Sequence, residues 1–564
     1  MSYISDLYPL KAQYRKNELV KICMEFLNPL ERSVELAAEI RIMNLTKVVE
    51  VIKIVFSLEP GRPNALTVEV PAQDTDFGGF GFDLDLYENA VIIETASTAF
   101  DVVSNWKKAM RYGFLCGFGP DEEPGDGDTK SLLKFHLNLV QFYDWTYRHH
   151  DFLPPEPQFR DLMGKQGDFK VILRKIAQCH EYGMKAIAYG PVYAADSSFF
   201  DSHKDWALYN SSGEAYKFID TFYIMNISPD SPWHDHIIGQ YKRAVAQAGF
   251  DGIHMDTYGF PKSGFSRLGG HEKAERLEEH LPVLINDTRQ ELEKTRDDVC
   301  LIFNNVCNWP VDAVAKAQQD AVYIEVWDPY ERYFHIQQLI GHALELGGGK
   351  PVILAAYLLP FRENPASKEA ENAALLLTAV IAACGGHHLL LGETNGVLTQ
   401  GYYVDHSTME DSFVHVMRLY YDFIVRFTQL LFDKTLKDVS MTHIDGDNME
   451  YAFENVDYST YEEPGRVCII AKESPERKII HLINLIGNNE DYWNTGKNDP
   501  VVQSGMIVKV QILSVPKCVY AASPDFELGR PQMLDFTVTD SDRGMIAAIK
   551  LLKLVYWNMV VMEF

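Results

Sequence analysis

The sequence has 564 residues, more than one hydrophobic core usually supports, so we expect two to four domains. Hydrophobic residues make up 46% and charged residues 23%, which is ordinary for a folded globular protein. The formal net charge of −27, without a long cluster of Lys and Arg, argues against nucleic acid as a partner and suits a neutral substrate.

The eight cysteines are scattered without a CxxC pair, which indicates neither a disulfide framework nor a zinc site. The His pairs at 149–150 and 387–388 lack the spacing of metal ligands, so no metal and no cofactor is predicted. No signal peptide is visible, and no apolar run reaches the roughly 20 residues that span a bilayer. We therefore expect a cytoplasmic protein without a membrane partner, or a secreted one if a leader has been trimmed.

Residues 1–112 carry short segments in which apolar and polar residues alternate, such as 19–26, 34–43 and 48–58. Turn-forming residues, for example Glu59-Pro60-Gly61-Arg62-Pro63, separate these segments. Alternation with period two between turns is typical of antiparallel strands with one buried face. We predict an N-terminal antiparallel β-sandwich of immunoglobulin-like type over 1–112.

From 113 to 434, compact apolar runs alternate with helix-like stretches such as 169–181, 234–248 and 273–298. This succession predicts a central (β/α)8 TIM barrel with insertions. An open doubly wound sheet has the same alternation, but the count of eight and the absence of a GxGxxG motif favour the barrel. The predicted strands are 137–145, 186–193, 222–227, 250–258, 299–306, 321–327, 351–359 and 387–393.

Apolar residues at helical spacing over 409–432 predict a helix that closes the barrel domain. Alternation with period two returns after about residue 435, for example in 478–485 and 506–513. We predict a second antiparallel β-sandwich over 435–564. The multidomain fold thus has a barrel between two β-sandwiches.

Polar and aromatic side chains cluster where the predicted barrel strands end, which is where a TIM barrel carries its active site. Cleaving a glycosidic bond needs two carboxyl groups, one to protonate the leaving oxygen and one to attack or stabilise the anomeric carbon. Asp256 and Glu325 end strands four and six and form a plausible pair, whereas spacing alone leaves Asp144, Asp196, Asp328 and Glu393 as competitors. The predicted substrate-binding residues are Tyr143, Asp144, Trp145, His149, Tyr189, Tyr193, Asn304, Trp309, Trp327 and Glu393.

Five segments in this order carry a family pattern: Arg111-Tyr112-Gly113-Phe114-Leu115; Gln141-Phe142-Tyr143-Asp144-Trp145 with His149-His150; Ala188-Tyr189 with Tyr193-Ala194-Ala195; Gly249-Phe250-Asp251-Gly252 with Asp256-Thr257; and Tyr323-Ile324-Glu325-Val326-Trp327. With these segments, residues 110–400 resemble glycoside hydrolase family 66, whose members are endo-dextranases and cycloisomaltooligosaccharide glucanotransferases. In that family the Asp after strand four is the nucleophile and the Glu after strand six is the acid/base. The resemblance implies these roles for Asp256 and Glu325.

The resemblance implies a retaining enzyme that hydrolyses internal α-1,6-glucosidic linkages of dextran or isomaltooligosaccharides. Hydrolysis is favoured because no loop is long enough for the carbohydrate-binding insertion of the cyclising members. Retention predicts carboxyl groups about 5 to 5.5 Å apart. The alternatives are a transglycosylase of the same family forming cyclic or linear isomaltooligosaccharides, a TIM-barrel glycosidase for another α-glucan, and a non-catalytic carbohydrate-binding protein. Product length, endo or exo preference and oligomeric state stay open.

Overall fold

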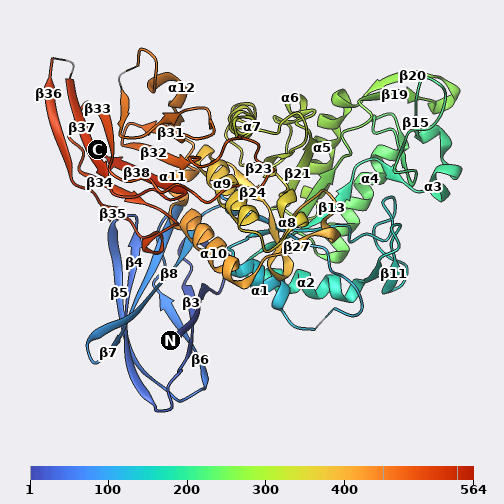
Figure 1. The fold of residues 1–564 in the computed structure, drawn as a ribbon. Coiled ribbons are helices and arrows are strands. Elements are labelled where there is room, and N and C mark those ends of the chain that lie inside the picture. The colour runs from blue at the N-terminus through green and yellow to red at the C-terminus, as the bar shows by residue number, and fades with distance from the viewer. Residues whose placement is uncertain (1, 123, 449, 543) are drawn as a thin grey trace.

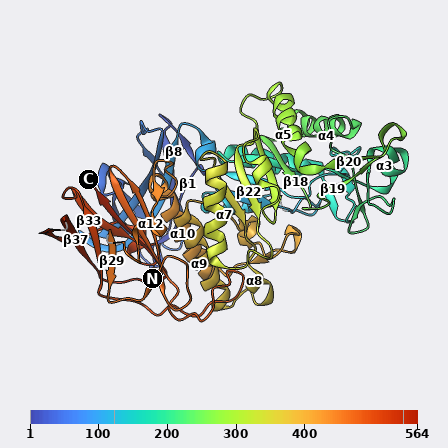
Figure 2. The same ribbon diagram turned by 90° about the horizontal axis from the view of Figure 1, so that it is seen from above.

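The computed structural model describes residues 2–122, 124–448, 450–542 and 544–564 and shows a multidomain, strand-rich fold. The strand-rich N-terminal and C-terminal parts lie side by side, and the central part of the chain extends away from them (Figure 1). The view from above shows the same arrangement, with helices α9 (Lys368–Cys384) and α10 (Asp411–Arg426) between the terminal parts and the central sheet (Figure 2).

The N-terminal part consists of two sheets that share one buried apolar cluster. Side chains in the cluster alternate along the strands: in β4 (Val34–Asn44), Leu36, Ala38, Ile40 and Ile42 are buried while their neighbours are half-buried or exposed. The sheets are mostly antiparallel, but β2 (Tyr14–Arg15) pairs in parallel with β8 (Val91–Val103). The other strands are β1 (Ile4–Pro9), β3 (Val20–Leu27), β5 (Lys47–Leu58), β6 (Pro63–Val70) and β7 (Phe77–Glu88).

The central part is built on parallel strands, buried along most of their length because helices and loops cover them. After the last of them, β25 (Leu391–Gly392) pairs in parallel with the first, β9, at Phe114. Their order in the sheet follows the chain: β9 (Tyr112–Leu115), β10 (Leu139–Phe142), β13 (Lys185–Pro191), β18 (Gly252–Asp256), β21 (Cys300–Val306), β22 (Ala321–Glu325), β23 (Val352–Ala355) and β24 (His387–Leu389).

One of the eight predicted barrel strands is wrong. The run 222–227 contains β17 (Phe222–Ile224), which pairs antiparallel with β14 (Ala194–Ala195) and β16 (Lys217–Phe218) in a separate small sheet. The parallel sheet instead begins with β9, whose four residues were too short to stand out. Asp256 and Glu325 nevertheless end the fourth and sixth parallel strands, as predicted.

The predicted helices agree with the structure in part. The stretch 234–248 corresponds to α4 (Pro232–Arg243) and the π-helical turn after it, Ala244–Ala248. The stretch 273–298 is wrong at its start, because Lys273–Arg276 is strand β20, which pairs with β19 (Ser263–Ser266), and the helix begins only at Leu277. The stretch 169–181 is helix α2 (Phe169–Glu181), whose first turn is capped by the Asp168 carboxylate accepting from the Lys170 amide. Among the described residues, no helix has the length and apolar character that crossing a membrane requires. The other main helices are α4 (Pro232–Arg243), α5 (Leu277–Glu293), α7 (Tyr333–Leu346), α9, α10 and α11 (Thr428–Leu431).

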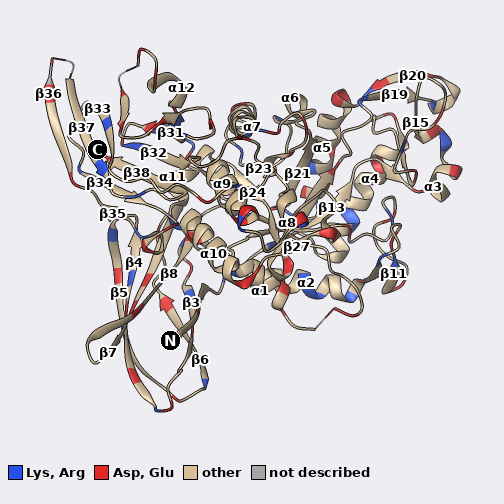
Figure 3. Ribbon diagram, viewed as in Figure 1, with Lys and Arg blue, Asp and Glu red and all other residues tan. Residues whose placement is uncertain are grey.

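The C-terminal part again has two sheets around one buried cluster. Acidic and basic residues are interspersed along the ribbon in all parts of the fold (Figure 3). The principal strands of one sheet are β31 (Val467–Ser474), β32 (Arg477–Asn484), β34 (Cys518–Ala522) and β38 (Trp557–Glu563), and those of the other are β29 (Tyr451–Glu454), β33 (Met506–Ile512), β36 (Phe536–Ser541) and β37 (Gly544–Leu551).

A buried ion pair joins the N-terminal part to the centre of the molecule. The Arg426 guanidinium on α10 donates to both carboxylate oxygens of Asp83 on β7, at 2.7 Å and 2.8 Å. Arg530, from the C-terminal part, lies 3.2 Å from the same carboxylate. Burial opposes ionisation of Asp83, but these hydrogen bonds and charges outweigh it and hold its pKa below the ordinary value.

Replacing this carboxylate is expected to destabilise the fold. Asp83→Ala leaves the Arg426 charge buried without its partner, which costs about 3 to 5 kcal/mol. The matched control is Glu88→Gln, because the Arg32–Glu88 pair is exposed on its arginine side and such pairs contribute little to stability. Thermal unfolding of both variants checks this, and equal melting temperatures would show that Asp83 does not hold the parts together.

Candidate active site

A cavity of about 470 Å³ opens at the carboxyl ends of the central parallel strands. Eight of the predicted site residues line it: Tyr143, Asp144, His149, Tyr189, Asp256, Asn304, Glu325 and Trp327. These residues come from the ends of β10, β13, β18, β21 and β22 or from the loops that follow them. The topology therefore brings to one rim residues that lie almost two hundred positions apart in the chain.

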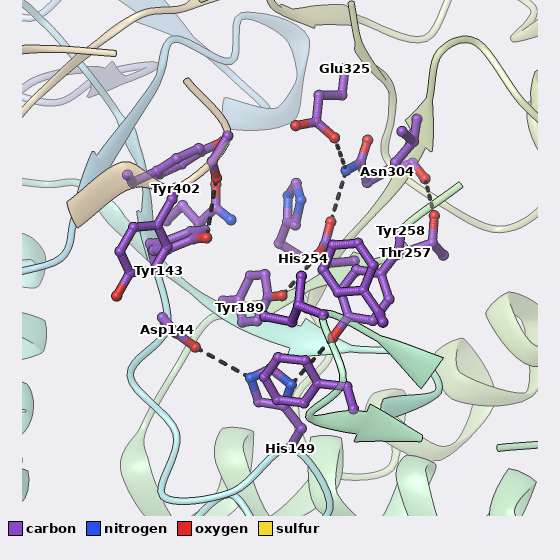
Figure 4. Close-up of a pocket in the computed structure, with 18 of the residues that line it drawn as sticks. Tyr143, Asp144, His149, Tyr189, His254, Thr257, Tyr258, Asn304, Glu325 and Tyr402 are labelled. Atoms are coloured by element: carbon purple, nitrogen blue, oxygen red, sulfur yellow. Dashed lines mark hydrogen bonds and ion pairs between the residues drawn. The ribbon is translucent and has the colours of Figure 1, made fainter. Parts of the chain in front are cut away.

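Two carboxylates face each other across one amide. Asp256 and Glu325 are the last residues of β18 and β22, and β21 between them carries Asn304. The Asn304 Nδ2 donates to Asp256 Oδ1 at 2.7 Å and to Glu325 Oε2 at 3.1 Å (Figure 4). The two oxygens therefore lie no more than about 5.8 Å apart, the sum of these distances.

Each carboxylate also accepts from a tyrosine hydroxyl. Tyr189 donates to Asp256 Oδ2 at 2.8 Å, and Tyr357 donates to Glu325 Oε1 at 2.8 Å. With Asn304, these bonds occupy both oxygens of each carboxylate and fix the orientation of both groups. The two carboxylates are therefore oriented before a ligand binds.

Burial raises the pKa of both carboxyl groups. The pKa of Asp256 rises to about 7, first because of burial and then because of the neighbouring Glu325 charge, while the bonds from Asn304 and Tyr189 oppose the rise. Burial likewise raises the pKa of Glu325 against its hydrogen bonds. Both groups therefore take up a proton at a higher pH than free carboxyl groups do.

Removing the bridging amide is expected to slow any reaction that uses this pair. Asn304→Ala removes a donor that stabilises both anions, so turnover should fall about 10²-fold. The pKa of Asp256 should rise further, so activity should be lost at a higher pH as the solution is acidified. A pH–rate profile of the variant measures both effects; a profile identical to that of the unchanged protein would exclude this role of Asn304.

A second polar group lies on the far side of Asp256. His149 Nε2 lies 3.3 Å from Asp144 Oδ1, and the Tyr258 hydroxyl lies 3.4 Å from His149 Nδ1. Burial opposes ionisation of Asp144, but the bond and charge of His149 outweigh it and lower its pKa. Figure 4 shows Glu325 and His149 at opposite ends of the site, with Tyr189 between them.

Four predicted substrate-binding residues do not line the cavity. Trp145 is buried against Phe250, with its indole N–H donating to the Tyr189 carbonyl. Strand β10 ends at Phe142 and Asp144 has a φ of +51°, so the period-two alternation of the strand does not continue to Trp145. The structure thus gives Trp145 a packing role in place of the predicted sugar contact.

The other three also lie outside the cavity wall. The buried Tyr193 hydroxyl donates to the Phe260 carbonyl and accepts from the Tyr258 amide, so it supports a lining residue from behind. The Trp309 ring lies under the Lys262 ammonium, 5.4 Å from its centroid. Glu393 is buried, accepting from the Gly117 amide and the Cys116 thiol.

The two other carboxylates that spacing alone left as catalytic candidates, Asp196 and Asp328, lie outside the cavity. Asp196 caps helix α3 (Ser197–Ser202) by accepting from the Phe199 amide. Asp328 is exposed on the loop after β22 and does not line the cavity. Within the described part of the chain, Cys116, Glu393 and His406 are the residues whose donor atoms come close enough together to hold a metal, and they lie outside the cavity wall.

Several lining residues were missed in the sequence. Tyr357 and Tyr403 are buried in apolar surroundings, and Tyr357 could have been found because it lies near the end of the predicted strand 351–359. Phe218, Ile219 and Phe222 belong to an insertion after β13 whose sequence shows no signal for proximity to the site.

Paired, half-buried carboxylates beside aromatic rings in a cavity are the arrangement that glycoside-cleaving enzymes use as a class. The sequence matches the family model described as Glycosyl hydrolase family 66 over residues 9–561, and the chain belongs to this family. The predicted family resemblance is confirmed.

Known members of the family are similar over most of the chain. Two cycloisomaltooligosaccharide glucanotransferases from Niallia circulans are each 24% identical, covering 99% and 100% of this chain and 72% of each relative. A dextranase from Streptococcus salivarius is 22% identical, covering 83% of this chain and 65% of the relative. A crystal structure of a Paenibacillus sp. cycloisomaltooligosaccharide glucanotransferase with cycloisomaltoheptaose matches the fold with a TM-score of 0.91 at 22% identity over the full length of both chains.

Proposed function

We propose that the protein is a retaining glycoside hydrolase that cleaves α-1,6-glucosidic linkages of isomaltooligosaccharides or dextran. The observation that carries the proposal is the carboxylate pair bridged by Asn304, with oxygens within about 5.8 Å. This limit fits the roughly 5 to 5.5 Å of retaining enzymes better than the roughly 6.5 to 9.5 Å of inverting ones. The substrate class rests on the names of its relatives, dextranase and cycloisomaltooligosaccharide glucanotransferase.

In the proposed first step, an Asp256 oxygen attacks the anomeric carbon of a bound glucosyl unit. The bond from that carbon to the leaving oxygen breaks, and Glu325 gives its proton to that oxygen. In the second step Glu325 removes a proton from water, the water oxygen bonds to the anomeric carbon, and Asp256 is released. The two inversions together retain the α configuration.

The elements around the pair support this sequence of steps. Tyr189 and Asn304 donate to Asp256 and thereby stabilise its anion after release. Glu325 lies next to Trp327 and Tyr357, on the side where the leaving sugar must receive the proton. Trp327 is 41% exposed at the rim, where an exposed indole ring can stack on a sugar.

We also propose that the central parallel strands form the closed (β/α)8 barrel predicted from the sequence. The pairing of β25 with β9 supports closure, because β25 follows β24 after a single residue. The separate buried clusters of the terminal parts support sandwich domains with boundaries near 1–112, 113–434 and 435–564.

Hydrolysis is proposed over cyclisation because the aligned glucanotransferases carry segments that interrupt their match to this chain. The alignments with the glucanotransferases run over 714 and 710 positions, whereas this chain has 564 residues, so those relatives carry segments with no counterpart here. Transfer to a second sugar uses the same glycosyl-enzyme and is the second candidate, since both glucanotransferases align with nearly the whole chain.

The test is chromatographic analysis of products from dextran and isomaltooligosaccharides, with amylose and pullulan in parallel. The expected result is products of the isomaltose series from the α-1,6 substrates. Cyclic or longer products would favour the transferase, and turnover of amylose alone would indicate another α-glucan as substrate. Binding of isomaltooligosaccharides without turnover would support a carbohydrate-binding protein and contradict the proposal.

A further inference from the structure

A short hairpin forms part of the cavity wall. It consists of β16 and β17, joined by residues 219–221, and lies in the long connection after β13. Phe218, Ile219 and Phe222 of this hairpin line the cavity. The hairpin therefore reaches the site from an insertion beyond the carboxyl end of the sheet.

Two stacked aromatic pairs fix the hairpin to residues of the site. Phe218 stacks on Tyr258, with ring centroids 4.1 Å apart and planes at 12°. Phe222 stacks on His149, with centroids 4.4 Å apart and planes at 7°. His149 and Tyr258 are themselves linked to Asp144, so the hairpin and this end of the cavity form one packed unit.

The tip of the hairpin has an unusual residue. Ile219 and Asp220 have φ angles of +44° and +57°, in the left-handed region that glycine and asparagine favour in such turns. A β-branched residue is disfavoured there, and the Ile219 side chain is also 54% exposed. Local stability therefore does not account for isoleucine at this position, whereas its place on the cavity wall does.

The hairpin lies at the end of the cavity away from Glu325. Asn304 connects Glu325 to Asp256, Tyr189 connects to Asp256 from the other side, and the His149 ring follows, 6.0 Å from that of Tyr189. Figure 4 shows the same order from Glu325 to His149. Since the acid protonates the leaving group, the glycosyl part that is retained on Asp256 extends toward His149 and the hairpin.

We propose that the β16–β17 hairpin, with Ile219 at its tip, ends the glycosyl side of the substrate cavity and limits the number of glucosyl units bound there. This inference rests on the proposed function and deepens it. A wall on this side directs cleavage to a fixed short distance from the non-reducing end of an α-1,6-linked chain. The Ile219 side chain then sets the length of the released product.

Ile219→Gly tests this because it shortens the wall in a conformation that suits glycine. The matched control is Asp220→Gly, which relieves the adjacent left-handed residue without changing a lining side chain. Both variants are expected to melt at or above the temperature of the unchanged protein. Ile219→Asn, which also tolerates this conformation, is the second variant should the glycine protein not fold.

The readouts are initial product length and kcat/KM over isomaltooligosaccharides of increasing length. In Ile219→Gly the initial products should lengthen by at least one glucose unit, and the ratio of kcat/KM for long over short substrates should rise about tenfold. Asp220→Gly should match the unchanged protein. Identical product lengths in all three folded proteins would overturn the inference.

Binding separates failure of this inference from failure of the proposed function. Calorimetry with the Glu325→Gln protein measures affinity against oligosaccharide length without turnover. The proposed function fails if the unchanged protein has no activity. The hairpin inference still stands in that case if Ile219→Gly, introduced into the Glu325→Gln protein, increases the oligosaccharide length beyond which the affinity no longer rises. No binding at any length would overturn both.

Discussion

Asp256→Ala will abolish turnover of α-1,6-linked substrates, with kcat reduced by about 10⁴-fold or more. Its carboxylate lies at the centre of the site, held by Asn304 and Tyr189, and a methyl group cannot attack the anomeric carbon. The measurement is kcat for isomaltooligosaccharide hydrolysis, beside thermal unfolding. Burial raises the pKa of Asp256 to about 7, which means that its ionised form is disfavoured in the folded protein. Asp256→Ala should therefore be no less stable than the unchanged protein near neutral pH.

Azide, a small anion, separates the role of Asp256 from that of Glu325. With an activated glycosyl fluoride, azide entering the space left in Asp256→Ala should give the β-glycosyl azide. Glu325→Ala should give the α-glycosyl azide, since Asp256 first forms the covalent intermediate. The opposite anomers would exchange the two roles, and residual activity of Asp256→Ala within tenfold of the unchanged protein would remove Asp256 from the mechanism.

Glu325→Gln will reduce kcat/KM on natural substrates by about 10² to 10⁴-fold, because the leaving oxygen loses its proton donor. On isomaltosyl fluoride, whose leaving group needs no acid, formation of the glycosyl-enzyme should be slowed far less. The variant should also lower the pKa of Asp256 below about 7, because the Glu325 charge is one cause of its rise. Activity toward the fluoride in Glu325→Gln should therefore persist to lower pH than in the unchanged protein.

The direction of this shift follows from the ionised form of Asp256 being the nucleophile. The acidic limb of the pH–rate profile lies at the pH where Asp256 takes up a proton, so a lower pKa of Asp256 moves this limb to lower pH. Asp328→Asn is the matched control: it removes a charge on the loop that follows β22, near Glu325, but that carboxylate is exposed. An acidic limb that stays in place in Glu325→Gln, or moves equally in Asp328→Asn, would show that the carboxyl groups of Asp256 and Glu325 are not coupled.

The sequence predicted most elements with one exposed face or clear helical spacing. The alternation in 34–43 and 48–58 corresponds to β4 and β5, and the stretch 169–181 is α2. The run 222–227 was wrongly predicted as a barrel strand, because apolar residues that cover a site have the same sequence pattern as those of a buried strand. The four residues of β9 were missed because their burial comes from neighbours far along the chain.

The carboxylate pair was predictable because two strand ends fixed where Asp256 and Glu325 lie, and the family resemblance supplied their roles. Trp145 and Tyr193 were misplaced because strand ends do not reveal which way the following side chains turn. Ile219 could not be predicted, since its place depends on how the hairpin stacks on His149 and Tyr258. The local sequence pattern thus locates the strand ends that form the rim of the cavity. The shape of the cavity depends on how inserted segments pack, which the sequence pattern does not show.

The most direct test of the central claim is to locate the covalent intermediate. Isomaltosyl fluoride reacts with the Glu325→Gln protein, whose second step lacks its base, and the digested protein is analysed by mass spectrometry. The account predicts one isomaltosyl group on the peptide that carries Asp256, attached to that residue. A label on another carboxylate, or rapid release of product with no labelled peptide, would contradict Asp256 as the nucleophile of a retaining enzyme.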